Sequence, residues 1–158
     1  MKLAFFDVDG VLSAPRYLDE SGAFVIGFSV DGWLAYCRNA GDRGYAYCLP
    51  VPGVEEFARG LAAEGCRLFV LSTLMSAPEE GAKRKFVEEQ YPDLFEDMIF
   101  VNRDSEKLTV IKERAEAAGC LLSECVLVED TFSTLLKAHE QGIRAIHISN
   151  LIAGNSSG

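Results

Sequence analysis

The sequence predicts an α/β protein whose core is a doubly wound parallel sheet of about five strands. Three observations predict this fold: short apolar runs, amphipathic helical patterns between them, and short connections that alternate the two. Strands buried on both faces of a parallel sheet are nearly continuous in apolar residues. Parallel strands joined through helices require right-handed crossovers, which place helices on both faces of the sheet.

The predicted strands are short and rich in β-branched or aromatic residues. They lie at 3–8, 67–71, 98–101, 125–129 and 144–148, with the sequences LAFFDV, RLFVL, MIFV, CVLVE and RAIHI. Because these runs lack clean alternation, each is expected to be buried on both sides.

Helical patterns follow at about 54–64, 78–91, 106–118 and 132–141. The first has an apolar stripe with the i, i+3, i+4, i+7 spacing of a helix and ends at Gly65. The second opens with Pro78 and two acids, which favour a helix N-terminus. Gly119 and Gly142 end the other two patterns.

One segment interrupts the alternation. Residues 13–52 separate the first strand from the next helix and hold seven of the sixteen aromatic residues. A loop of this length without secondary structure is unusual in a compact domain. Tyr17 to Val30, with Ser21-Gly22 in the middle, predicts a β-hairpin. We therefore expect one domain over 1–153 that carries 13–52 as a flap or small cap, and a disordered tail at 154–158.

Composition narrows the class of protein. The chain has 158 residues, 49% hydrophobic and 25% charged, which is typical of a soluble globular domain. Its five cysteines include no Cys-x-x-Cys pair, and no run is long enough to span a membrane. We expect a cytoplasmic protein with free thiols. The net charge of −9 argues against nucleic acid and anionic membranes as partners, and is compatible with a cation site.

Acidic residues end the first and fourth predicted strands. Asp7 and Asp9, before Gly10, point the same way if the strand stays extended. Two close carboxylates repel unless a cation or a shared proton lies between them. Glu129 and Asp130 follow the fourth strand and would complete a set of oxygen ligands for a hard cation, Mg²⁺ above all. An acidic helix N-terminus is the structural alternative.

Hydroxyl and ammonium groups are predicted at the same edge. Ser72 and Thr73 end the second strand, where hydroxyl and backbone N–H groups can hold a phosphate oxygen. Taken alone, a helix cap or a plain turn is the better explanation of these two residues. Lys107 begins the third helix and could neutralise a bound phosphate. Lys112, one turn further along, is its rival for that role.

This constellation resembles the haloacid dehalogenase superfamily of phosphotransferases, in a capless or small-cap form, over nearly the whole chain. Asp7-Val8-Asp9-Gly10 is similar to the family's first motif, Ser72 or Thr73 to the second, Lys107 to the third, and Glu129-Asp130 to the fourth. The position four residues after Asp130, often acidic in the family, is Thr134 here.

The resemblance implies a role for each residue. Asp7 would be the nucleophile that forms an aspartyl-phosphate, and Asp9 the general acid and base that also offers its carbonyl to Mg²⁺. Ser72, Thr73 and Lys107 would hold the phosphoryl group. Asp130 would bind Mg²⁺, with Asp7 as a further ligand and Glu129 in support.

The implied function is Mg²⁺-dependent hydrolysis of a small phosphorylated metabolite, either a nucleotide or a sugar phosphate. A non-catalytic phosphate-binding or metal-binding protein on the same fold is the alternative, and a phosphotransferase is a third possibility. The hairpin resembles the flap of small tetrameric sugar-phosphate phosphatases. With the clustered aromatic residues, it suggests a homo-oligomer formed through 13–52.

Overall fold

The computed structural model describes residues 1–27 and 29–153, so the predicted tail at 154–158 lies outside the described residues. Among the helices it describes, none is both long enough and apolar enough to cross a bilayer.

The core is a five-stranded parallel sheet, which confirms the predicted fold class. Its order is β7-β6-β1-β8-β9, with every neighbouring pair parallel. The strands are β1 (Leu3–Phe6), β6 (Arg67–Thr73), β7 (Asp97–Val101), β8 (Cys125–Glu129) and β9 (Arg144–His147). All residues of β1 and β8 are buried, as expected for central strands covered on both faces.

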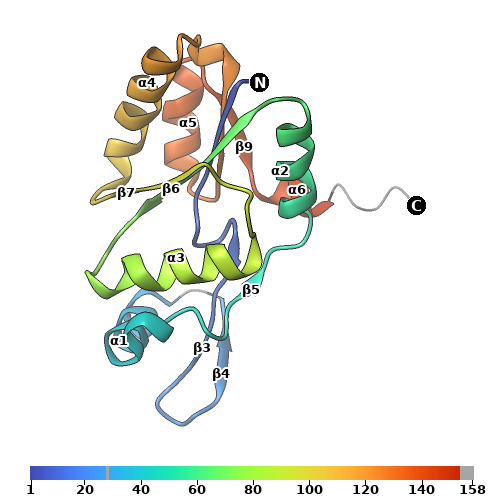
Figure 1. Ribbon diagram of the computed structural model, residues 1–158. Helices are drawn as coiled ribbons and strands as arrows, with labels where there is room; N and C mark the ends of the chain where they lie inside the picture. The colour runs from blue at the N-terminus through green and yellow to red at the C-terminus, as the bar shows by residue number, and fades with distance from the viewer. Residues whose placement is uncertain (28, 154–158) are drawn as a thin grey trace.

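Helices cover both faces of this sheet (Figure 1). They are α2 (Val54–Ala63), α3 (Pro78–Gln90), α4 (Lys107–Ala118), α5 (Phe132–Glu140) and α6 (Ser149–Ala153), with short 3₁₀ turns η2 (Asp104–Glu106) and η3 (Leu122–Glu124). Successive residues of β1 point to opposite faces. Leu3 and Phe5 therefore join the core under α4 and α5, while Ala4 and Phe6 join the core under α2 and α3.

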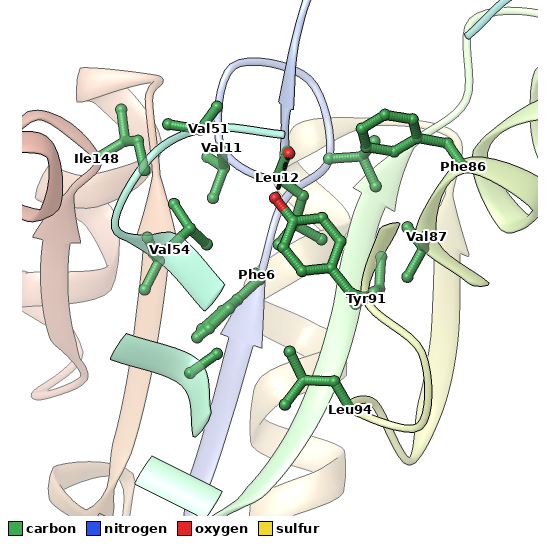
Figure 2. Packing of buried hydrophobic residues seen from close by; sticks show 14 of the residues in the cluster. Phe6, Val11, Leu12, Val51, Val54, Phe86, Val87, Tyr91, Leu94 and Ile148 are labelled. Carbon is green, nitrogen blue, oxygen red and sulfur yellow. Dashed lines mark hydrogen bonds between the residues drawn. The ribbon is translucent and has the colours of Figure 1, made fainter. Parts of the chain in front are cut away.

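The second core extends beyond the end of β1 (Figure 2). Val11 and Leu12, in the turn that follows the strand, pack there with Val54 of α2 and Phe86 of α3. The Tyr91 hydroxyl donates to the Leu12 carbonyl at 2.6 Å and is buried. The packed side chains of this core and the hydrogen bond from Tyr91 thus fix the turn that carries the acidic residues.

The segment 13–52 is folded and lies at the carboxyl edge of the sheet (Figure 1). It contains β2 (Ser13–Ala14), β3 (Arg16–Leu18), β4 (Phe24–Ile26), α1 (Val30–Ala40), η1 (Gly41–Arg43) and β5 (Leu49–Pro50). β3 and β4 form the predicted hairpin, which is shorter than expected, and β2 pairs with β5. The helix α1 was not predicted.

Three aromatic residues of this segment are part of the core. Tyr17, Trp33 and Tyr45 are at most 4% exposed. Ring centroids lie 5.6 Å apart for Tyr17 and Trp33, 5.2 Å for Trp33 and Tyr45, and 5.8 Å for Tyr45 and Phe86 of α3. These three aromatic residues therefore help to pack the segment 13–52 against the rest of the protein. Because they are buried, they are not available for a subunit interface, contrary to the expectation of clustered exposed aromatic rings. Phe24 and Tyr47 remain exposed.

Candidate active site

A tight turn after β1 sets the position of the acidic residues. The Val8 carbonyl accepts hydrogen bonds from the N–H groups of Val11, Leu12 and Ser13 at 3.2, 3.0 and 2.9 Å. Gly10 has a φ of +77°, and a Cβ at this position would collide with the Asp130 carboxylate. The turn therefore needs glycine both for its left-handed backbone and for the close approach of Asp130.

Lys107 joins the ends of β1 and β8. Its Nζ lies 2.7 Å from Glu129 Oε2 and 3.3 Å from Asp7 Oδ2, and it is 1% exposed. Asp104 Oδ1 lies 3.6 Å from the same nitrogen. The structure thus brings Lys107 against Asp7, whereas Lys112, the rival in the sequence, is exposed.

The electrostatics of this cluster favour a charged Asp7. Burial is the largest single influence on Asp7 and would raise its pKa, but the charges of Lys107 and Lys83 and the hydrogen bonds to its carboxylate together outweigh burial and hold that pKa below its usual value. Burial, together with the negative charge of Asp7, raises the pKa of Glu129. Despite its own burial, Lys107 has a raised pKa because Asp7 and Glu129 stabilise its charge. Two carboxyl groups compete here for one ammonium, and a cation would relieve that competition.

Asp9 is oriented differently from Asp7. Its Oδ2 lies 3.1 Å from the Nζ of Lys83, a fully buried lysine of α3, and its Oδ1 accepts from the Tyr45 hydroxyl at 2.5 Å. The Asp9 carboxylate thus faces α3 and the segment 13–52, and it is not among the carboxylates grouped around Asp7.

The two hydroxyl residues at the end of β6 have different surroundings. Ser72 is buried, and its Oγ accepts from Lys83 Nζ at 2.9 Å. Thr73 lines the cavity above Asp7, and its Oγ1 donates to Asp104 Oδ1 at 2.5 Å. Of the two alternatives in the sequence, Thr73 is the one whose side chain lies at the open site.

Three acidic residues form a candidate metal site. Carboxylate oxygens of Asp7, Glu129 and Asp130 lie within 4.8 Å of one another. Glu129 also has protein donors, because its Oε1 accepts from the backbone N–H groups of Asp130 and Thr131 at 3.2 and 3.4 Å. Oxygen donors with excess negative charge fit Mg²⁺, which commonly uses one or two carboxylates and completes its shell with water and substrate oxygens.

A cavity of about 440 Å³ opens above these residues. Its acidic lining consists of Asp7, Asp9, Asp104 and Asp130, and Gly10, Gly27, Pro15, Val30, Thr73, Met75 and Thr131 complete it. Val30 and Met75 are about half exposed, at 53% and 47%. The opening therefore combines an acidic floor with apolar contacts at its rim.

Three residues of this site escaped the sequence analysis: Lys83, Tyr45 and Asp104. A signal for Lys83 was present, because Glu79 and Lys83 share the buried stripe of α3 with Ala82, Phe86 and Val87. Charged residues at apolar positions of a helix need partners. Asp104 lies three residues before Lys107, a spacing that favours pairing. No sequence pattern singled out Tyr45 among the other aromatic residues.

Thr134, where the resembled family often has an acid, lies in α5 and is 5% exposed. It is not among the described residues that line the cavity. The acids near Asp7 on the β8 side are Glu129 and Asp130.

Comparison of the folds identifies the class of structure. The chain is similar to CbbY from Rhodobacter sphaeroides in complex with phosphate, with a TM-score of 0.59, 15% identity, and coverage of 93% of this chain and 85% of that one. It is also similar to D,D-heptose 1,7-bisphosphate phosphatase from Burkholderia thailandensis, with a TM-score of 0.56, 16% identity, and coverage of 99% and 86%. At these identities the likeness shows a shared α/β fold.

A third similar structure is 3-deoxy-D-manno-octulosonate 8-phosphate phosphatase from Moraxella catarrhalis, solved with magnesium, phosphate and the sugar acid. The TM-score is 0.50 at 22% identity, over 90% of this chain and 64% of that one. No family model matches the chain, and no curated protein matches it. The chain therefore has the fold of a group of structures that includes several phosphatases.

Proposed function

We propose that this protein is a Mg²⁺-dependent phosphomonoester hydrolase that works through an aspartyl-phosphate on Asp7. One observation carries the proposal: Asp7 lies at the floor of an open cavity, paired with Lys107 and beside Glu129 and Asp130. The similar folds of heptose bisphosphate and octulosonate phosphatases support it.

The first step transfers the phosphoryl group to the protein. An oxygen of Asp7 attacks phosphorus, the bond from phosphorus to the ester oxygen breaks, and a proton from Asp9 goes to the leaving oxygen. Lys107 neutralises charge on Asp7 and on the incoming phosphate. Thr73 offers a hydroxyl at the same edge of the cavity.

The second step restores the protein. Asp9, now ionised, takes a proton from water, and the water oxygen attacks phosphorus. The bond from phosphorus to the Asp7 oxygen breaks, which regenerates the carboxylate and releases inorganic phosphate. Asp7, Asp130 and the carbonyl of Asp9 would hold Mg²⁺, with Glu129 in support. When bound, the cation offsets the negative charge of the phosphate oxygens.

The lining of the cavity bears on the substrate. Among the described residues that line it, none is basic. A second phosphate or a carboxylate on the leaving group would therefore meet acids without a counter-charge. We expect phosphate monoesters whose leaving group is neutral and partly apolar, since Val30 and Met75 are available at the rim. Glycerol phosphate should exceed 3-phosphoglycerate in kcat/KM, and the reverse order would refute this preference.

The primary test is phosphate release from a panel of nucleotides, sugar phosphates and an aryl phosphate, with and without Mg²⁺, beside Asp7→Asn. Release that requires Mg²⁺ and is lost in a folded Asp7→Asn protein supports the proposal. Equal turnover by the variant would rule out the covalent route. A folded wild-type protein that binds phosphate without turning over any ester would favour the non-catalytic alternative. Transfer to an added alcohol instead of water would indicate a phosphotransferase.

A homo-oligomer formed through the segment 13–52 stays a prediction.

A further inference from the structure

Asp9 is held by two donors from different parts of the chain. Lys83 reaches it from α3, and Tyr45 reaches it from the segment 13–52. Both residues are buried, with Lys83 fully inaccessible to solvent, whereas the Asp9 side chain is 16% exposed and lines the cavity. Asp9 thus has one side toward the cavity and the other toward two fixed donors.

Lys83 has no proton left for a substrate. Its ammonium group lies 3.1 Å from Asp9 Oδ2, donates to Ser72 Oγ at 2.9 Å, and donates to the Thr73 carbonyl at 2.6 Å. These three partners match the three N–H donors of a lysine. Since Lys83 is also outside the lining of the cavity, any influence it has on the reaction passes through its neighbours.

Tyr45 is a rigid donor. Its ring lies between Trp33 of α1 and Phe86 of α3, with centroids at 5.2 and 5.8 Å. A tyrosine hydroxyl carries its proton at neutral pH, so this group donates to Asp9 Oδ1. The packed ring fixes the direction from which that proton reaches Asp9.

With two donors bound, the Asp9 carboxylate can still accept and release a proton. Each carboxylate oxygen has about two lone-pair sites, so each oxygen of Asp9 keeps one after Lys83 and Tyr45 have bound. We propose that Lys83 and Tyr45 are positioning residues that hold the Asp9 carboxyl group at the angle required for proton transfer. The segment 13–52 then contributes to catalysis through Tyr45. This inference rests on the proposed hydrolase function.

The inference predicts a dependence on the leaving group. Transfer to Asp7 from an alkyl phosphate needs a proton on the departing oxygen, and Asp9 supplies it. A 2,4-dinitrophenolate departs without that proton. Loss of Asp9 positioning should therefore slow transfer from alkyl esters but not from the dinitrophenyl ester. Attack by water on the aspartyl-phosphate should slow in both cases, because Asp9 must accept a proton there.

The experiment uses Lys83→Met and Tyr45→Phe with Mg²⁺ in rapid-mixing kinetics. The first variant removes the charge at similar length, and the second removes only a hydroxyl. With an alkyl phosphate, kcat should fall about 100-fold in Lys83→Met and about tenfold in Tyr45→Phe. With 2,4-dinitrophenyl phosphate, the rate constant of the initial burst of dinitrophenolate should stay within about threefold of wild type. Phosphoprotein should accumulate, as seen by mass spectrometry.

Two further variants separate positioning from general loss of structure. Tyr91→Phe removes another buried tyrosine hydroxyl, which donates to the Leu12 carbonyl and not to Asp9. This variant should lower thermal stability while leaving the leaving-group dependence unchanged. In an Asp9→Asn background, Lys83→Met should cost little further activity, because residues that act through one group are not additive.

The outcomes are distinguishable. Wild-type protein that releases neither dinitrophenolate nor phosphate from any of these esters would overturn the proposed function and this inference together. Wild-type turnover combined with an equal slowing of the transfer step from both substrates in Lys83→Met and Tyr45→Phe would overturn only the positioning role. If Lys83→Met lowered activity as much in the Asp9→Asn background as in wild type, the positioning role would also be overturned. If Lys83→Met does not fold, Tyr45→Phe decides the question.

Discussion

At the scale of single residues, the site depends on how buried charges are partnered. Lys83 and Lys107 are both nearly inaccessible, and each is surrounded by oxygen atoms. An isolated buried ammonium would cost several kcal/mol, so each lysine requires its acids as much as the acids require it. The acids at strand ends were predictable because their spacing is a local pattern. Lys83 was not singled out, because its partner Asp9 is far away in the sequence and only the fold brings them together.

Gly10 provides a prediction at this scale. Gly10→Ala forces a Cβ against Asp130 at a φ of +77°, whereas Gly22, at +82°, has open space around it. Both substitutions to alanine should lower the free energy of unfolding by about 1–2 kcal/mol, because each forces a left-handed backbone on alanine. Only Gly10→Ala should also raise the half-saturating Mg²⁺ concentration, by about tenfold or more. Thermal unfolding and Mg²⁺ titration of activity measure the two effects, and equal Mg²⁺ dependence in both variants would contradict the prediction.

At the scale of elements, the parallel register explains why the acids meet. β1 pairs Phe6 with Val128 of β8, so the residues that follow, Asp7 and Glu129, emerge side by side at the same edge. This is why strand assignment from apolar runs was enough to predict the meeting point. The segment 13–52 was harder, because α1 buries only Trp33 and Cys37, which give a single helical repeat. The long-range ring contacts that hold it to α3 leave no local signal.

The cysteines in these elements give a second prediction. Burial raises the pKa of Cys37 in α1 to about 12 and that of Cys125 in β8 to about 11. Since only the thiolate reacts with iodoacetamide, about one in a thousand Cys125 side chains is reactive at pH 8. Native protein should be alkylated first at Cys120, which is partly exposed, and the other two should react only after denaturation. Peptide mapping measures the order. If Cys125 were labelled faster than Cys120 in native protein, the Cys125 thiol would not be buried in β8 as the structure has it.

At the scale of the whole molecule, negative charge is concentrated where the fold ends its strands. The chain carries a net charge of −9, and five of its carboxylates, those of Asp7, Asp9, Asp104, Glu129 and Asp130, gather around two lysines at one edge of the sheet. Mutual repulsion of these acids opposes folding, and a divalent cation bound only by the folded state would oppose that repulsion. The fold class predicted this edge as the site, because ligands of doubly wound sheets bind at the carboxyl ends of the strands.

This leads to a prediction that does not depend on turnover. At Mg²⁺ concentrations about 100 times the dissociation constant, binding should add about 2.7 kcal/mol to the free energy of unfolding. For a domain of this size that corresponds to a rise in Tm of roughly 5–10 °C. Asp130→Asn should abolish most of the rise, whereas Asp31→Asn, which changes an exposed acid of α1, should retain it. Scanning calorimetry with NaCl matched for ionic strength separates binding from general screening of charge. A rise of equal size in NaCl, or in Asp130→Asn, would show that the stabilisation comes from screening and that these acids do not form a magnesium site.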